Sequence, residues 1–448
     1  MLHQGTFFKY ATQFLWQASQ LASRRLGKLI KEHYLLIFFL LSIPVMISRI
    51  SENPRAVIWS DAEGYYQYLP ALFIINDVHQ LPPGSVWPYF NDRGEYVNKY
   101  TCGIAYFEWP FFLAAYVLSD LFGYTASDYF NPVYCYAMAA SGLFFAFLGL
   151  FFLRKSLLKI VRPGIAFLVL CSVFFGTNLF HYATKEMSVS HVYSFFLFTV
   201  FIWLMPSVLK KTALRNSLCI GMVLGWMVLI RPTNVIIGAL LLLWDVYAWQ
   251  DFKTRLLLLT SNLRAIRYLG LGLVLPVFPQ LLYWKEMTGH WLYYSYTHEG
   301  FPYWNQPKIA AVLFDVQNGL FLYSPLVLLM VVGIFLLFRK KKFQAPSALF
   351  LFALATYIFS SWWAWWFGGA FGHRCYVEYY AILAFPLAGL YEHMWQMRSQ
   401  LLRYGFFALV AFLIFFSVRL SYLYAPPWDG PEWRWNWEKY SDILRQLF

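Results

Sequence analysis

Long apolar runs alternate with short polar segments along almost the whole chain. A helix needs about 20 mainly apolar residues to cross a bilayer. Eleven runs approach this length: 34–50, 131–153, 163–180, 189–209, 215–231, 233–249, 267–285, 320–338, 347–362, 379–395 and 402–424. The pattern predicts an all-α polytopic membrane protein with about 11 transmembrane helices.

A further apolar run, 104–122, carries Glu108, Pro110 and Asp120. The distribution of basic residues decides its place, because Lys and Arg gather in cytoplasmic loops. If 104–122 does not span, the basic clusters share one side: Arg24 to Lys31, Arg154 to Arg162, Lys210 to Arg215, Lys253 to Arg267, Arg339 to Lys342, and Arg398 with Arg403. A spanning helix would move every later cluster to the other side. We therefore predict an interfacial, partly embedded helix on the outer face.

This topology gives one membrane domain, with the amino terminus in the cytoplasm and the carboxy terminus outside. The first apolar run is expected to be a retained anchor, because the tail before it is too long for a signal peptide. The expected divisions are a basic tail (1–33), a transmembrane domain (34–424) whose first outer loop (51–130) holds interfacial helices near 61–75 and 104–122, and an outer aromatic tail (425–448).

Composition agrees with a membrane protein. Hydrophobic residues make up 60% of the 448 and charged residues 13%, against roughly 25% charged residues in soluble domains. The net charge of +13 follows from the basic inner loops, which favour anionic lipid headgroups, so no nucleic-acid partner is expected. The five cysteines show no metal-ligand spacing.

The outer loops carry the candidate chemistry, starting with the stretch SDAEGYYQY after the first apolar run. Ionisable residues at a membrane need either a partner or a function. Ser60 and Glu63 have the spacing of a capping box, so Glu63 has two interpretations, a helix cap or a site residue. Asp61 would lie in the first turn, with Tyr65 on the same face. There a carboxylate can act as a general base toward a hydroxyl or an amine.

Basic outer residues are candidates for binding an anion. Arg374 follows Gly368, Gly369 and Gly372; its guanidinium matches phosphate oxygens, and the glycines allow close approach of a ligand. The alternative for Arg374 is an ion pair with Glu378. Lys99 is either a second phosphate contact or a solvated lysine.

Several further outer residues are candidates for substrate binding, each with a structural alternative. Arg231, between two apolar runs, either binds a ligand or is paired structurally. His191 lies at an outer helix mouth, where one histidine can equally be a satisfied hydrogen-bonding group. For Tyr323, a turn followed by a helix start accounts for its position equally well. The other candidates in these loops are Lys185, Glu186 and His373.

These stretches together resemble the GT-C glycosyltransferases, in particular the bacterial branch related to protein O-mannosyltransferases and aminoarabinose transferases. The resemblance rests on SDAEGYYQY, KYTCGIAYFEWPFFLAAYVLSDLFG (99–123), NGLFLYSP (318–325) and GGAFGHRCYVEYYAILAFPLA (368–388). It covers most of the chain in topology. The Lys99 segment departs from the branch, which usually has a proline there.

The resemblance implies a GT-C-like bundle that transfers a sugar from a polyprenyl-phosphate donor by inversion. It implies that Asp61 is the catalytic base, with Glu63 beside it, and that Arg374, Lys99 and Arg231 hold the phosphate. The acceptor would be a protein, a lipid or a glycan on the outer, periplasmic face of a bacterial inner membrane. Some GT-C enzymes use a divalent cation, Mg or Mn, for which Asp61, Glu63, Glu186 and His191 are the donors here.

Two other classes share this helical pattern. A lipid-linked sugar flippase or other transporter predicts polar residues near the middle of the membrane, whereas the ionisable residues here gather at the outer ends. No internal repeat indicates the inverted halves of many transporters. A non-catalytic membrane scaffold would leave the outer acids and arginines without a purpose. A membrane glycosyltransferase is therefore the leading hypothesis.

Overall fold

The computed structural model describes residues 33–82, 89–91, 93–125, 127–210, 213–340, 342–424 and 436–447. The predicted basic tail, except His33, and residues 425–435 of the predicted outer tail lie outside the described residues. Within this part, the chain is almost entirely helical, and its two strands, β1 and β2, form a short antiparallel ribbon. The prediction of an all-α polytopic membrane protein is confirmed.

The first described helix, His33–Ile50, leads into the segment predicted to be the first outer loop. That loop contains η1 (Pro54–Ile58), α2 (Asp61–Tyr66), α3 (Tyr68–Pro70), the π-helical turn η2 (Ala71–Ile75), β1 (Tyr89–Phe90), β2 (Tyr96–Val97) and α4 (Ala105–Leu121). The central part contains α5 (Pro132–Leu157), α6 (Pro163–Phe175), α7 (Leu179–Thr184), α8 (Ser190–Lys210), α9 (Leu214–Ile230), η3 (Pro232–Ala239), α10 (Leu240–Leu243), α11 (Trp249–Thr260) and α12 (Leu263–Thr288). The last part contains α13 (Ile309–Phe314), α14 (Leu320–Tyr323), α15 (Leu326–Phe338), α16 (Ala345–Ser361), η4 (Arg374–Tyr376), α17 (Tyr380–Trp395), α18 (Gln400–Leu423) and α19 (Trp437–Arg445).

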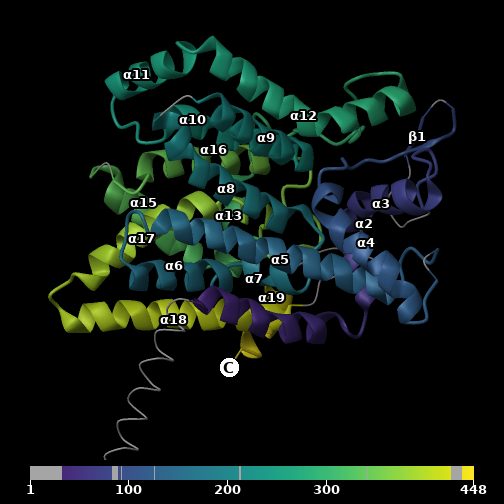
Figure 1. Cartoon of the computed structure of the whole chain (residues 1–448). Helices are drawn as coiled ribbons and strands as arrows, with labels where there is room; N and C mark the ends of the chain where they lie inside the picture. Colours follow the sequence, from purple (N-terminus) through teal and green to yellow (C-terminus); the bar gives the residue numbers. More distant parts are fainter. Residues whose placement is uncertain are drawn as a thin grey trace, which may run out of the picture.

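Among the described residues, five helices are long and apolar enough to cross a membrane: the first helix, α5, α8, α12 and α18. Shorter apolar helices occupy most of the other predicted runs, including α6, α9, α15 and α16. Figure 1 shows these helices lying side by side, with α2, α3 and α4 gathered at one end of the bundle. The connection from α10 to α11 lies toward the opposite end.

Three of the predicted runs are interrupted rather than continuous. Run 163–180 divides into α6 and α7, because α6 ends at Gly176. Run 233–249 begins with a 3-10 segment that has Pro232 in its first turn. Run 320–338 is broken between α14 and α15, where Pro325 precedes the second helix. Glycine and proline are poor helix formers, so α6 ends at Gly176 and α15 begins only after Pro325.

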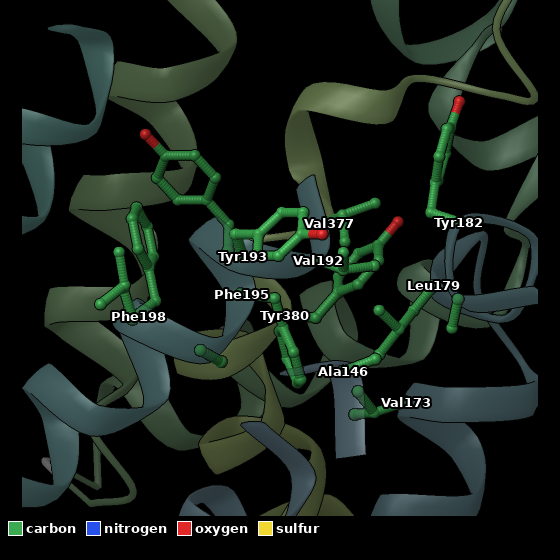
Figure 2. Packing of buried hydrophobic residues seen from close by; sticks show 14 of the residues in the cluster. Ala146, Val173, Leu179, Tyr182, Val192, Tyr193, Phe195, Phe198, Val377 and Tyr380 are labelled. Carbon is green, nitrogen blue, oxygen red and sulfur yellow. The ribbon is translucent and has the colours of Figure 1, made fainter. Parts of the chain in front are cut away.

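The core is built around α17, whose residues from Tyr380 to Tyr391 are all buried. A helix that is apolar on every side is stable only when other helices surround it, and α6, α8, α15 and α16 pack on α17. Figure 2 shows part of this packing around α8, and the ring of Phe198 on α8 lies 5.3 Å from the ring of Tyr379, centre to centre. The buried α17 holds the segment just before it, which contains Arg374 and Glu378, in a fixed position.

Helices α9 and α12 meet along a seam of glycines. A Cβ at Gly221 would collide with the backbone oxygen of Leu269, and one at Gly225 with that of Leu273. On the facing helix, Gly272 lies equally close to the backbone of α9. Small residues let membrane helices approach at backbone distance, so this seam fixes α12 against α9.

Helix α4 occupies most of the segment 104–122 and packs on α5. One side of α4 is buried and includes Phe112 and Ala115. The other side exposes large apolar residues, with Val117 73% and Leu121 77% exposed. An exposed apolar side is the pattern of a helix in contact with lipid.

Candidate active site

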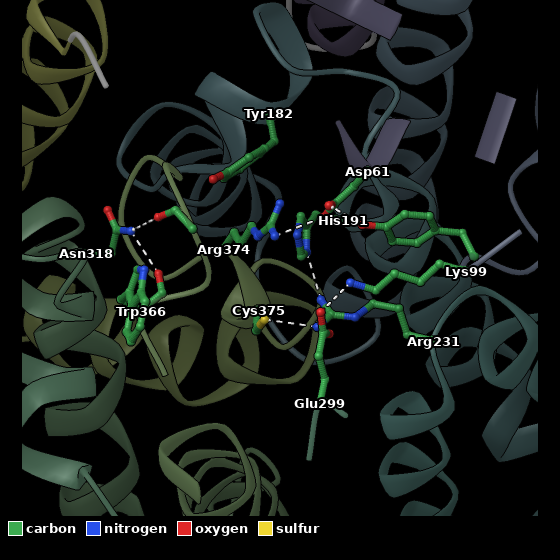
Figure 3. A network of polar contacts seen from close by, with 12 residues as sticks. Asp61, Lys99, Tyr182, His191, Arg231, Glu299, Asn318, Trp366, Arg374 and Cys375 are labelled. Carbon is green, nitrogen blue, oxygen red and sulfur yellow. Dashed lines mark hydrogen bonds and ion pairs between the residues drawn. The ribbon is translucent and has the colours of Figure 1, made fainter. Parts of the chain in front are cut away.

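Asp61 and Arg374 form the centre of a polar network at the end of the bundle that carries α2 (Figure 3). Asp61 lies in the first turn of α2, and its Oδ2 is 2.9 Å from Nη2 of Arg374. The hydroxyl of Tyr100 donates a hydrogen bond to Oδ1 of Asp61 at 2.6 Å. The side chains of Asp61 and Arg374 are 24% and 19% exposed, so a ligand can reach the pair.

Lys99 lies beside this pair and is joined to Glu299 of the loop after α12. Its Nζ is 2.5 Å from Oε1 of Glu299, and it lies 5.1 Å from the ring centre of Tyr296. Both charged groups are mostly buried. The solvated alternative for Lys99 is therefore wrong, because the lysine is held at the site by an acid and aromatic rings.

A deeper layer of the network is formed by Arg231, Glu378 and His191. Nη1 of Arg231 is 3.5 Å from Oε1 of Glu378, and the other oxygen of that carboxylate is 3.2 Å from Nδ1 of His191. Arg231 also donates a hydrogen bond to the thiol of Cys375 at 3.1 Å. Glu378 is thus paired with Arg231 and not with Arg374, the partner considered from their spacing in sequence.

The segment that carries Arg374 is held in shape by residues from the NGLFLYSP stretch. The side-chain amide of Asn318 donates hydrogen bonds to the backbone oxygens of Trp366 and Gly368, each at 2.8 Å. Gly372 has a φ of +63° and lies against the Cβ of Tyr323, a conformation that few residues other than glycine adopt. The buried Tyr323 donates its own hydroxyl to the backbone oxygen of Val316. Tyr323 therefore supports the segment and lies away from Asp61.

Electrostatics keep Asp61 ionised. Burial alone would raise its pKa, but the positive charge of Arg374 and the hydrogen bond from Tyr100 outweigh burial and hold the pKa below its usual value. The same attraction raises the pKa of Arg374. The pair is a carboxylate and a guanidinium at neutral pH.

Glu378 behaves differently because it is almost completely buried. Burial raises its pKa to about 7, although the nearby charge of Arg231 acts in the opposite direction. The charge of the deeper layer therefore changes close to neutral pH.

Two predicted residues next to the network have buried positions. The ring of Tyr65 lies 4.9 Å from that of Tyr100, beside Asp61. His373 is held by its own segment and by α16: its Nε2 donates to the backbone oxygen of Trp365 at 3.0 Å, and its ring stacks on Phe359. Of these two, Tyr65 borders the site and His373 stabilises the segment.

Lys185 and Glu186 follow α7 and belong to a neighbouring group of charges. Oε1 of Glu186 lies 3.2 Å from Nε2 of His181. Burial would raise the pKa of Glu186, but His181 and Arg374 hold it below its usual value. These residues lie at the same end of the bundle as Asp61 without contacting it.

Glu63 has a structural position, and the predicted capping box is wrong. Ser60 has a φ of 55°, and among the described residues its side chain caps no amide of α2. The Glu63 carboxylate is fully buried and lies 3.1 Å from Nη2 of Arg55. Arg55 in turn stacks over the ring of Phe130. Glu63 therefore anchors the start of α2, facing away from Arg374.

The predicted metal donors do not converge in the described part of the chain. Asp61 contacts Arg374 and Tyr100, Glu63 contacts Arg55, and His191 contacts Glu378. No group of three His, Cys, Asp or Glu among the described residues could hold a metal ion. The donor set therefore does not fit a divalent cation at Asp61.

Sequence reasoning missed Tyr100 and Glu299. Tyr100 is adjacent to Lys99 in the quoted KYTCG stretch, and a phenol beside a candidate phosphate contact was a signal that could have been used. Glu299 lies in a long loop without a motif, so only the fold brings it to Lys99.

No protein-family model matches this sequence, and no curated protein is similar to it. Among solved structures, the fold is similar to the archaeal oligosaccharyltransferase AglB from Archaeoglobus fulgidus, which was solved with an inhibitory peptide and a dolichol-phosphate. The TM-score is 0.49, the sequence identity is 13%, and the similarity covers 94% of this chain and 60% of that protein. The chain thus spans less than two thirds of the length of AglB.

Proposed function

We propose that this protein is a GT-C-type membrane glycosyltransferase that moves a sugar from a polyprenyl-phosphate donor to an acceptor. The observation that carries this proposal is the partly exposed pair of Asp61 and Arg374, surrounded by Lys99 and Arg231. A carboxylate that can take a proton then lies beside cations that can hold a phosphate. Transfer from a lipid phosphate needs both groups in one site.

Arg374 is the main phosphate contact in this proposal. Its planar guanidinium suits two phosphate oxygens at once. Lys99 and Arg231 provide further positive charge, although each is already paired with an acid. As the bond from the sugar to the phosphate breaks, negative charge grows on the phosphate, and these cations stabilise it.

Asp61 is the general base. It removes the proton from the acceptor hydroxyl or amine, and the acceptor atom attacks the anomeric carbon. The bond from that carbon to the phosphate oxygen breaks, and its electron pair leaves with the polyprenyl phosphate. One displacement inverts the configuration at the anomeric carbon.

The contact between Asp61 and Arg374 couples donor binding to the strength of the base. A donor phosphate competes with Asp61 for the guanidinium. When Arg374 turns to the phosphate, Asp61 loses the attraction that holds its pKa down. The pKa of Asp61 then rises, so the carboxylate accepts a proton more readily once the donor is bound.

We place the site on the outer, periplasmic face of a bacterial inner membrane, with the amino terminus in the cytoplasm. The distribution of basic loops supports this orientation. Helix α19 supports a carboxy terminus on the same side as the site, since the Tyr440 hydroxyl donates to the backbone oxygen of Leu322, near the Arg374 segment. A protein, a lipid or a glycan on that face would be the acceptor.

The test is transfer of label from a polyprenyl-phosphate sugar by the purified protein and by Asp61→Asn. Loss of a general base lowers the rate by about 10²–10⁴-fold, and donor binding should persist because Arg374 is unchanged. Glu392→Gln is the matched control, since Glu392 is paired with Arg162 at the other end of the bundle. Equal transfer by Asp61→Asn and wild type would remove Asp61 from the role of base.

The same purified protein can be used to distinguish a glycosyltransferase from a transporter. Reconstituted in vesicles, a flippase would move the lipid-linked sugar between leaflets without forming a new glycosidic bond. Lipid movement without product would contradict the proposed reaction.

A further inference from the structure

A second group of positive charges lies at the outer end of the first helix, apart from Asp61 and Arg374. Nη1 of Arg49 donates to Oγ1 of Thr184 at 3.0 Å. Nη2 donates to the backbone oxygen and to Oγ of Ser421, at 2.7 and 3.0 Å. The guanidinium also lies over the ring of Tyr422, 4.6 Å from its centre. Arg49 thereby joins the first helix, α7 and α18.

All of these acceptors are neutral, and the nearest acid, Glu186, acts on Arg49 through its charge without forming an ion pair with it. In the described part of the chain, no carboxylate lies within ion-pair distance of its guanidinium. The contacts use at most three of the five N–H groups of an arginine. The guanidinium therefore keeps donors for another anion.

Lys185 adds a second positive charge beside Arg49. It directly follows Thr184, which Arg49 contacts. Across the described ranges, Lys185 has neither a hydrogen-bond partner nor an ion-pair partner for its side chain. Burial, and then repulsion from Arg49, lower the pKa of Lys185, while the nearby Glu186 acts in the opposite direction. Glu186 itself is engaged by His181.

The surroundings of this pair are apolar, and they are open on the side of α18. The ring of Tyr422, which lies against the guanidinium of Arg49, is 49% exposed, whereas the nearby ring of Phe180 is buried. Both helices turn most of their apolar surface outward. In Figure 1 the purple first helix runs beside α18. A cation at such a surface is stabilised when an anion with an apolar tail lies against it.

We propose that Arg49 and Lys185 form a second anion site, which binds the phosphate group of a lipid in the outer leaflet. The arginine offers a planar fork and the lysine a point charge, a combination suited to phosphate oxygens. The lipid chain would lie along the apolar surface of the first helix and α18. This site goes beyond the proposed function, because it uses none of Asp61, Arg374, Lys99 and Arg231.

The experiment measures lipid binding by native mass spectrometry of the full chain in detergent, with polyprenyl phosphate as the probe. It starts from Arg374→Gln, so that the proposed donor site is weakened. Adding Lys185→Gln should lower the remaining binding by about tenfold or more, since one charge-assisted contact is lost. Arg49→Gln should do the same, and Arg49→Lys should recover part of the binding.

Lys185→Gln is the decisive variant, because Arg49 also joins three helices and its removal is expected to lower Tm. Arg445→Gln is the matched control: Arg445 is 78% exposed and is paired with Asp442 of its own helix. If Lys185→Gln leaves binding and Tm unchanged, the site does not exist. If Arg49→Gln lowers Tm while neither Lys185→Gln nor Arg49→Lys changes binding, Arg49 is a structural clamp only, and the proposal is overturned.

Competition identifies the source of the phosphate. Displacement of the probe by phosphatidylglycerol supports a bulk-lipid site, whereas displacement only by unlabelled polyprenyl phosphate supports a site for a substrate-like lipid. Displacement by inorganic phosphate at equal concentration would show that the lipid chain contributes nothing, which contradicts a lipid site. None of these outcomes depends on glycosyl transfer, so the proposed function is tested separately.

Discussion

The two ends of the helical bundle differ in how far their charged side chains are buried. At the end that carries α2, charged groups are largely buried and pair across long stretches of sequence, as Asp61 does with Arg374. At the other end, Arg162 is 47% exposed where it meets Glu392. There a cavity of about 430 Å³ has Lys159 and Lys342 among its lining residues.

This difference in burial separates charges that are explained by their exposure to solvent from charges that need a functional explanation. Exposed basic residues at a membrane need only water and anionic headgroups. Burying a charge costs several kcal/mol unless it is well paired, so a protein that buries Asp61, Arg231 and Arg374 together needs a reason to do so. In the proposed function, chemistry on an anionic substrate supplies that reason, and it does so at one end only.

The largest effect on donor binding is expected from Arg374→Gln. It removes the proposed phosphate contact and leaves Asp61 without its ion-pair partner. We expect donor affinity to fall by about 10²-fold, the value of a strong charge-assisted contact, with partial recovery in Arg374→Lys. Titration of a non-hydrolysable polyprenyl-phosphate sugar analogue measures this, and unchanged affinity would mean that the donor binds elsewhere.

A structural effect is expected from Glu63→Gln. The change removes the buried negative charge that pairs with Arg55, at a cost of about 1–3 kcal/mol. The loss should appear as a lower Tm in detergent, and Arg55→Gln should lower Tm in the same direction. A larger fall in the rate of transfer than in Tm would instead give Glu63 a catalytic role.

A smaller effect is expected from pH, through Glu378. Its pKa is raised to about 7 by burial, so lowering the pH through 7 protonates it and removes one negative charge beside Arg231. A phosphodiester donor does not titrate in this range, and its binding should tighten by about tenfold or less from pH 8 to pH 6. Glu378→Gln should bind at both pH values as the wild type does at pH 6. A pH dependence that persists in Glu378→Gln would assign it to another group.

The smallest effect is expected from Arg162→Gln at the opposite end. Exposed ion pairs contribute about 0–1 kcal/mol, so Tm should shift slightly and transfer should stay the same. A marked loss of transfer would show that the two ends are coupled.

Much of the fold could be predicted, because apolar runs of about 20 residues are stable chiefly as helices in a bilayer. The same reasoning placed Asp61, Lys99, His191, Arg231 and Arg374 in outer loops, and the structure brings them into one network. Their partners could not be predicted. Tyr100 and Glu299 reach the site through contacts between distant segments, which no local spacing encodes.

Glu63 shows the limit of local rules most clearly. Its spacing from Ser60 fits a capping box, but the backbone turns at Ser60 and the carboxylate pairs with Arg55. A buried carboxylate needs a charged partner, and leaving it unpaired costs more free energy than losing a cap at a helix end. Asp61 and Glu63 therefore differ in their partners: Asp61 is paired with Arg374, and Glu63 with Arg55.

The glycine seam between α9 and α12 restricts how the proposed lipid substrate can reach the site. Backbones that touch at Gly221 and Gly225 leave no width for an isoprenoid chain to slide between the two helices. Helices α9 and α12 therefore form one rigid unit, with Arg231 at the end of α9. A lipid must approach the polar network from another side of the bundle, and an entrance that opens during turnover must lie between other helices.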